Sequence, residues 1–282
     1  MGRSAKGPNT ASRRQRQTRN SPRRPGGPVD YSLRASRFLR AGRPAATIPA
    51  WWVNTVIGIF LLPAAGIWTQ TFFTCFSRAA VHHGFWASEE FWFFALGALL
   101  WTIAFFGLPR PMLLYVFGHE LTHALWVWAM GGRVSKFQVR RDGGHIVSDT
   151  NNFWVALAPY FFPLYSILVI VLYGGIGLFH DVSHYRQLLF ALIGATWAFH
   201  VSFTLWMIPK GQTDLSYHGT FFSLVVIYIM NLLLLTVLLL IASPHTSLRF
   251  FGGEMLHNAS AFSRWIALEI RVAARGRWFS RF

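Results

Sequence analysis

The sequence predicts an all-α, multi-pass membrane protein with about six transmembrane helices and a short β-hairpin after the third helix. Hydrophobic residues make up 53% of the 282 residues, charged residues only 13%, and the mean hydropathy is +0.37. This composition is too apolar for an ordinary soluble domain. Many of the 13 Trp residues stand near the ends of apolar runs, as in an interfacial belt.

Residues 1–45 predict a separate, disordered, Arg-rich cytoplasmic tail. Arginines recur among Gly, Pro, Ser and Gln from Arg13 to Arg43, and Asp30 is the single acid there. Such a segment buries no core, although 31–43 could form a basic helix on the membrane surface. A topology signal that contacts anionic lipid explains the charge best. A nucleic-acid tail lacks a base-reading module, so no specific nucleic-acid partner is expected, and the charged part is too long for a cleaved signal.

The transmembrane domain is expected over residues 46–243, where six apolar runs qualify as spans. Pro109 and Pro111 separate the second run from the third, and Pro159 and Pro163 predict a kink in the fourth. The expected spans are residues 51–76, 91–106, 112–130, 153–179, 187–208 and 215–241.

Six spans place both termini on one side of the membrane. Both ends of the chain are basic, and the net charge is +16, so both termini are expected in the cytoplasm of a plasma-membrane protein. The remaining segment, 244–282, is predicted to be a basic amphipathic helix on the inner leaflet or against a partner protein. Its apolar face would contain Met255, Ala259, Phe262, Ile266, Ile270 and Ala273.

The third run contains the sequence His-Glu-Leu-Thr-His at residues 119–123. Positions four apart share one helix face, so His119 and His123 can bind one metal ion, with Glu120 beside it to transfer a proton. The plainer interpretation is two hydrogen-bonded helix histidines and a stray glutamate. Three ionisable groups in a membrane helix are costly, which favours a zinc site.

A β-hairpin is predicted within residues 131–152, between the third and fourth spans. Phe137 and Val139 alternate with polar residues, and Asp142-Gly143-Gly144 is a turn signal. The hairpin also contains Arg133, Lys136, Arg140 and Arg141, which fits poorly with the outer side that six spans assign to it. A hairpin that dips back toward the histidines would reduce this conflict.

Two histidines leave zinc short of the three protein ligands of a catalytic site. Asp214, at the start of the sixth span, is the preferred third ligand, and helix N-capping is its alternative role. His200, deep in the fifth span, is a possible auxiliary residue, either as ligand or as oxyanion donor. His145, and the pair His180 and His184 with the same spacing as the motif, are weaker candidates. The single cysteine, Cys75, excludes intrachain disulfides and thiolate clusters.

Residues 112–241 resemble the site-2-protease-type intramembrane metalloproteases, the M50 family, especially its small M50B-like branch. The resemblance rests on His119-Glu120-Leu121-Thr122-His123, on two glycine pairs around the hairpin, on Ala158-Pro159-Tyr160-Phe161-Phe162-Pro163, and on Thr213-Asp214. It implies zinc bound by His119, His123 and Asp214. The chain has Asp214-Leu215 where the family usually has Asp-Gly, and no PDZ-like insert is visible.

The resemblance and the motif together predict zinc-assisted hydrolysis of membrane-protein substrates, with Glu120 as the proton carrier. The hairpin could hold the unwound substrate as an added strand. The main alternative is a non-catalytic zinc-binding scaffold or regulator on the same fold. A transporter is a further alternative, but no inverted repeat is evident. The sequence does not indicate an oligomeric state.

Overall fold

The computed structural model describes residues 50–81, 86–243 and 246–279, which belong to one compact unit. The expected tail, 1–45, lies outside the described residues.

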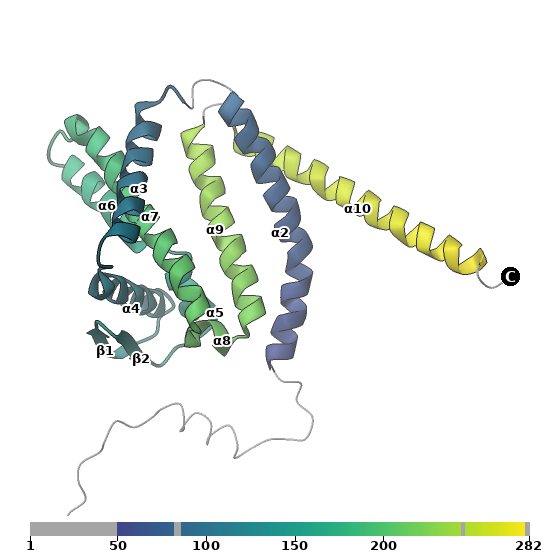
Figure 1. The fold of residues 1–282 in the computed structure, drawn as a ribbon, viewed down its shortest axis with the longest axis horizontal. Coiled ribbons are helices and arrows are strands. Elements are labelled where there is room, and N and C mark those ends of the chain that lie inside the picture. Colours follow the sequence, from purple (N-terminus) through teal and green to yellow (C-terminus); the bar gives the residue numbers. More distant parts are fainter. Residues whose placement is uncertain (1–49, 82–85, 244–245, 280–282) are drawn as a thin grey trace, which may run out of the picture. The chain divides into compact units, whose positions relative to one another are not determined.

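The described residues are mostly helical, as the composition predicts, and Figure 1 shows their arrangement. Eleven of the elements belong to the helical framework and the segments that join it. They are α2 (Ala50–Val81), α3 (Glu89–Gly107), α4 (Met112–Ala129), α5 (Phe153–Leu157), η1 (Ala158–Tyr160), α6 (Leu164–Gly177), η2 (Ser183–Tyr185), α7 (Arg186–Met207), η3 (Ile208–Lys210), α8 (Thr213–Tyr217) and α9 (Thr220–Ala242). The hairpin strands are β1 (Val134–Arg140) and β2 (Gly143–Ser148), and α10 (Leu248–Phe279) follows α9.

Four helices of the described part are long and apolar enough to cross a membrane: α2, α3, α7 and α9. The segments 153–160 and 164–177 would make a fifth span if this pair, bent by 79°, is one span. The expected helix at 112–130 is present as α4, but α4 is not among the candidate spans. The expectation of six spans is therefore not confirmed. The expectation of a helical membrane protein is confirmed, with four or five candidate spans.

The long helices pack in pairs whose directions follow from side-chain contacts. Asn54 near the start of α2 donates to the His218 carbonyl just before α9 (2.8 Å), and Trp68 donates to Thr236 farther along (3.0 Å). These two helices are therefore parallel. The helices α3 and α7 are also parallel, because Gln187 bonds Glu89 at their starts (3.1 Å) and Trp101 bonds Ser202 toward their ends (2.9 Å).

The helix α4 starts and ends at one end of this bundle. Its first turn packs where α3 and α7 end, through Tyr115 against Phe105 and Phe203. Its last turns meet the segment before α6, where the Trp126 ring contacts Phe161 edge-on, with ring centroids 5.5 Å apart. Figure 1 shows α4, the hairpin and α8 at the same end of the long helices, which we call the site end.

The predicted hairpin is confirmed, with β1 and β2 paired antiparallel. Arg140 pairs with Gly143, so Arg141 and Asp142 form a two-residue turn. Gly143 has a backbone φ of +151°, which residues other than glycine rarely adopt. This explains why a glycine stands at the start of β2. The pairing turns β2 back toward α4.

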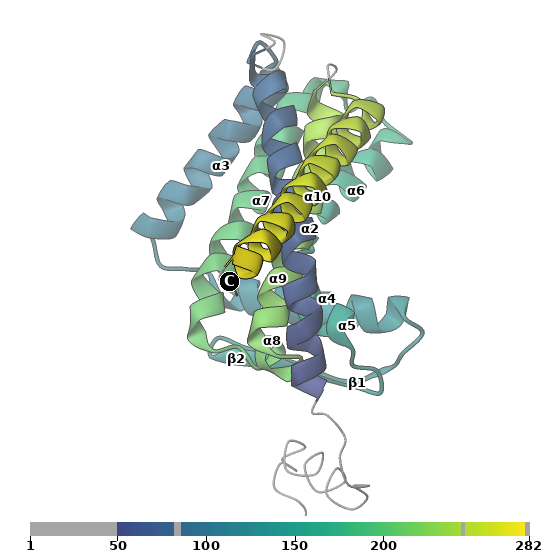
Figure 2. The ribbon, with the colours of Figure 1, turned by 90° about the vertical axis from the view of Figure 1, so that its right-hand side faces the viewer.

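The helix α10 has two different halves. In the first half, Phe251 is buried and Asn258 donates to Thr71 of α2 (3.0 Å). From Ser263 to Arg275 every residue is exposed. Figure 1 shows this half extending away from the long helices, and in Figure 2 it lies in front of them. Its exposed side chains include the apolar Trp265, Leu268 and Val272 as well as the basic Arg264, Arg271 and Arg275, and the amphipathic role expected for this segment stays a prediction.

Candidate metal centre

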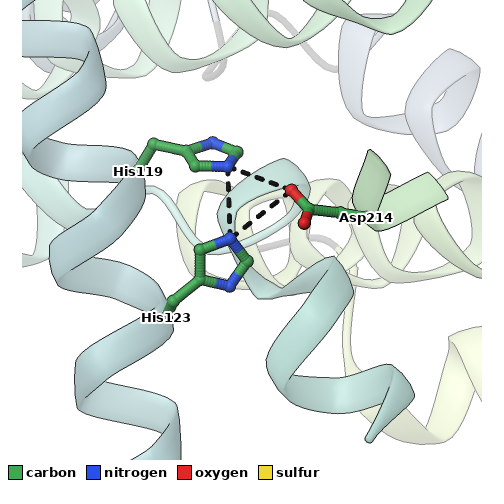
Figure 3. A group of neighbouring side chains, drawn as sticks. All are labelled: His119, His123 and Asp214. Carbon is green, nitrogen blue, oxygen red and sulfur yellow. Dashed lines mark hydrogen bonds and ion pairs between the residues drawn. The ribbon is translucent and has the colours of Figure 1, made fainter. Parts of the chain in front are cut away.

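His119, His123 and Asp214 meet at the site end, and they are the group of metal-ligating side chains identified among the described residues. Figure 3 shows two ring nitrogens and one carboxylate oxygen turned toward a common point. His119 Nε2 lies 3.2 Å from His123 Nε2 and 3.2 Å from Asp214 Oδ2, and His123 Nε2 lies 3.5 Å from the same oxygen. Two α4 residues and one residue of α8, far apart in sequence, thus form a triangle of donor atoms.

The triangle has the dimensions of three corners of a tetrahedral zinc site. Ligands at about 2.0–2.1 Å from a tetrahedral zinc ion stand about 3.3 Å from one another. The three observed separations, 3.2, 3.2 and 3.5 Å, fall around that value. Two imidazoles and one carboxylate also match the donor set of catalytic zinc sites, which leave the fourth position open. The residues present therefore fit a zinc ion.

His123 is oriented for this role by the backbone. Its Nδ1 lies 2.8 Å from the Val155 carbonyl, which only accepts, so Nδ1 carries the proton and donates. The neutral ring then presents a bare Nε2 to the triangle. A ligating histidine usually donates its second nitrogen in this way, which fixes the tautomer and the ring orientation.

His119 has a side-chain partner instead. Its Nδ1 lies 3.3 Å from the Tyr115 hydroxyl, one turn earlier on the same face of α4. The Tyr115 ring is stacked on Phe203 of α7, with centroids 4.6 Å apart and planes 9° from parallel. Phe203, near the end of α7, therefore fixes the position of Tyr115, and Tyr115 in turn bonds His119.

Asp214 is placed by a short helix between two glycines. The helix α8 has only five residues and follows Gly211 (φ +74°) and precedes Gly219 (φ +93°), both in conformations that favour glycine. Asp214 is in its first turn, and Gln212 is the N-cap residue, so N-capping is not the role of Asp214. Tyr160 of η1 donates a hydroxyl bond to Asp214 Oδ2 (3.2 Å).

The surroundings of Asp214 keep its carboxylate anionic. Burial by itself raises the pKa of Asp214, but the closeness of the His119 and His123 rings outweighs it and holds the pKa below its usual value. A carboxylate that stays ionised offsets part of the charge of a divalent metal, which neutral histidines do not do.

Glu120 lies beside the triangle in a cavity of about 340 Å³ that also contains His119, His123 and Asp214. Its side chain is 6% exposed. Burial, opposed by His123 and reinforced by Asp214, raises the pKa of Glu120 to about 7. The strand β2 forms another wall: a Cβ on Gly144 would lie 2.5 Å from Glu120 Cγ, so the hairpin approaches Glu120 as closely as a glycine permits.

The other histidines named from the sequence lie elsewhere. His200 is not in the triangle, but lines a smaller cavity of about 30 Å³ next to His119. His145 lines the larger cavity that contains Glu120. His180 and His184 are exposed beside η2, in the connection between α6 and α7, away from His119, and do not share a helix turn as the motif histidines do.

Sequence reasoning missed the supporting residues Tyr115, Val155 and Gly144 and the role of Tyr160. Tyr115 had a usable signal, because it precedes His119 by four residues and so shares its helix face. Tyr160, Val155 and Gly144 had none, because their contacts depend on how separate elements meet.

In comparisons with family models, curated proteins and solved structures, no match to this chain was found. The geometry and chemistry of the site are therefore the basis for its function.

Proposed function

We propose that this protein is a membrane-embedded zinc metalloprotease that hydrolyses peptide bonds of membrane-protein substrates. One observation supports this above all. A donor triangle of zinc dimensions shares a cavity with a buried glutamate, one residue from the first ligand. A structural zinc site needs four protein ligands and no neighbouring acid, whereas a hydrolytic site needs three ligands, an open position and a proton carrier.

The residues divide the chemistry among themselves. A bound zinc ion would supply Lewis-acid polarisation of the scissile carbonyl and a more acidic water. His119, His123 and Asp214 would hold it. The Glu120 carboxylate takes a proton from the attacking water and delivers it to the departing amide nitrogen. The strand β2, which lines the same cavity, offers an edge along which an unwound substrate segment could pair as an additional strand.

We also propose five membrane spans, with the bent segment 153–177 as the third. The helix α4 starts and ends at the site end, so it does not carry the chain across. Five spans place the termini on opposite faces, in contrast to the expectation of two cytoplasmic termini. The site end then faces the cytoplasm of the plasma membrane, because the basic hairpin lies at that end and α2, which the Arg-rich segment precedes in the sequence, starts there.

The test of orientation is a pair of reporter fusions in the full chain, at residues 20 and 275. We expect a cytoplasmic signal at residue 20 and an external signal at residue 275. Cytoplasmic signals at both positions would mean that the number of spans is even and that α4 crosses the membrane.

The test of activity compares wild type with Glu120→Gln, using purified protein and a panel of membrane-protein segments as substrates. We expect cleavage by wild type, a rate lower by about 10²–10⁴-fold in Glu120→Gln, and equal zinc content in both. Glu269→Gln, an exposed glutamate of α10, is the matched control and should cleave normally. A wild type that binds zinc and cleaves no segment of the panel would favour the non-catalytic scaffold.

A further inference from the structure

The small cavity behind His119 contains an unused hydrogen-bonding atom. His200 Nε2, on α7, is fully buried and has no hydrogen-bond partner among the described residues. A buried polar atom without a partner is costly, and native structures usually satisfy such atoms with protein or with ordered water. His200 therefore requires an explanation that packing alone does not give.

The cavity that His200 lines offers both the room and the partners. Its volume of about 30 Å³ exceeds the roughly 10–15 Å³ that one water molecule needs. Tyr115 and Thr122 line it as well, together with His119. Thr122 donates its hydroxyl proton to the Gly118 carbonyl (2.7 Å), so it can offer a water molecule only an acceptor.

The hydroxyl of Tyr115 has a proton to donate in the same place. If His119 binds zinc through Nε2, its Nδ1 carries the ring proton and donates to the Tyr115 oxygen (3.3 Å). The Tyr115 oxygen is then an acceptor in that bond, and its own O–H proton must point elsewhere. With the His200 ring proton on Nδ1, Nε2 is a free acceptor, so a free donor, Tyr115 Oη, and a free acceptor, His200 Nε2, belong to residues that line one cavity of water size.

We propose that His200 is a positioning residue of the metal centre, which acts through a buried water molecule and Tyr115 on His119. The chain of bonds runs from His119 Nδ1–H to Tyr115, from the Tyr115 hydroxyl to the water, and from the water to His200 Nε2. It fixes the His119 tautomer, as the Val155 carbonyl does for His123. Partners of this kind typically change metal affinity by about 10–100-fold.

This inference rests on the zinc site of the proposed function but not on proteolysis, so its test measures zinc affinity. The dissociation constant is measured by chelator competition on the full chain in detergent. The variants are His200→Phe, Tyr115→Phe, the double variant and His200→Gln, with His184→Phe as control. The exposed His184 precedes the same helix at its other end.

We expect His200→Phe and Tyr115→Phe each to weaken zinc binding by about 10–100-fold, and the double variant to be no weaker than the poorer single variant. His200→Gln should recover most of the loss, because its amide oxygen can accept the bond. The control should equal wild type. If His200→Phe does not fold, His200→Leu takes its place in the same cycle.

Three results would overturn the proposal. Unchanged zinc affinity in His200→Phe would show that His200 does not act on the site. Multiplying losses in the double variant would show that it does not act through Tyr115. Complete loss of zinc, as expected for His123→Ala, would make His200 a direct ligand. Absence of peptide cleavage in a protein that shows the expected affinities would contradict the proposed protease function and leave this inference intact.

Discussion

Two regions of the molecule, the pair α3 and α7 and the surroundings of α4, are packed in opposite ways. The pair α3 and α7 is held at close range by glycines: a Cβ on Gly97 would lie 1.9 Å from the Ala191 carbonyl oxygen, and one on Gly194 would lie 2.0 Å from that of Phe94. The region around α4 instead buries Glu120 and His123 and connects them to neighbouring segments by hydrogen bonds and a cavity.

This difference in packing indicates that the α3–α7 pair serves the stability of the fold and the region around α4 serves metal binding. In α3 and α7 the backbones touch, so almost any added atom strains the pair, but no titratable group is buried between their central turns. Around α4 the backbones are spaced by side chains, and polar atoms meet across the space. A substitution in the first region should therefore change folding, and one in the second should change metal binding. Single substitutions in each region can test that division.

The largest effect is expected at the ligand histidines. His119→Ala or His123→Ala removes one of three donors, so bound zinc should fall from about one per chain to near zero. Asp214→Asn keeps the shape but loses the charge, and should weaken zinc binding while the protein stays folded. Metal analysis of purified protein measures all three. Full zinc occupancy in both histidine variants would refute the site.

The next largest effect is expected at Gly144. An added Cβ would lie 2.5 Å from Glu120 Cγ and 2.9 Å from the Gln138 carbonyl oxygen, so either Glu120 or the hairpin must move. A displacement near 1 Å at a reacting group can cost about 10²-fold in rate, and we expect Gly144→Ala to lower cleavage by that order with zinc retained. Gly66→Ala, where a Cβ meets nothing within 4 Å, is the matched control. Equal cleavage rates in both variants would show that the position of the hairpin at Gly144 does not affect catalysis.

A moderate effect, on folding stability and not on metal binding, is expected at Gly97. Gly97→Ala forces α3 away from α7, and such overpacking typically costs about 1–3 kcal/mol in the free energy of unfolding. Thermal unfolding in detergent should show the loss, while zinc content stays that of wild type. Gly174→Ala in α6, where a Cβ meets nothing within 4 Å, should show neither change. Loss of zinc in folded Gly97→Ala would mean that the two regions are coupled.

The smallest effect is expected at Tyr160. Tyr160→Phe removes the hydroxyl that donates to Asp214 and leaves the ring, so zinc affinity should fall by about tenfold. Tyr173→Phe is the matched control, because its hydroxyl bonds the Val182 carbonyl beside η2, outside the metal site. Chelator competition measures the zinc affinity of both variants. Identical affinities would show that the Tyr160 hydroxyl does not contribute to zinc binding.

Hydropathy predicted the positions of the helices well, because each apolar run needs an internally bonded backbone whatever it packs against. It did not predict which runs cross. Residues 112–129 form a helix, as expected, yet the two ends of α4 contact elements at the same end of the bundle. Only contacts between distant residues, such as Tyr115 with Phe203, contain that information.

The candidate site divides in the same way. Local spacing on one helix is enough to place His119, Glu120 and His123 together. Asp214 was predicted from its place at the start of an apolar run and from the family resemblance, and the structure places it in a separate five-residue helix rather than at the start of α9. The contacts of Tyr160, Val155 and Gly144 with the site depend on segments meeting from different elements, which no local pattern specifies.

The brevity of α8 has an evolutionary consequence. Five residues are too few to hold a helix by their own hydrogen bonds, so α8 depends on Leu215, which is 2% exposed and packs among Leu157, Tyr160 and Phe222. Ser223 of α9 also donates to the Leu215 carbonyl (2.9 Å). Selection on the metal centre must therefore extend to apolar residues that never touch the ion. A volume change at Leu215 or Phe222 would move the carboxylate of Asp214, and drift in this core would be restricted as if it were part of the site.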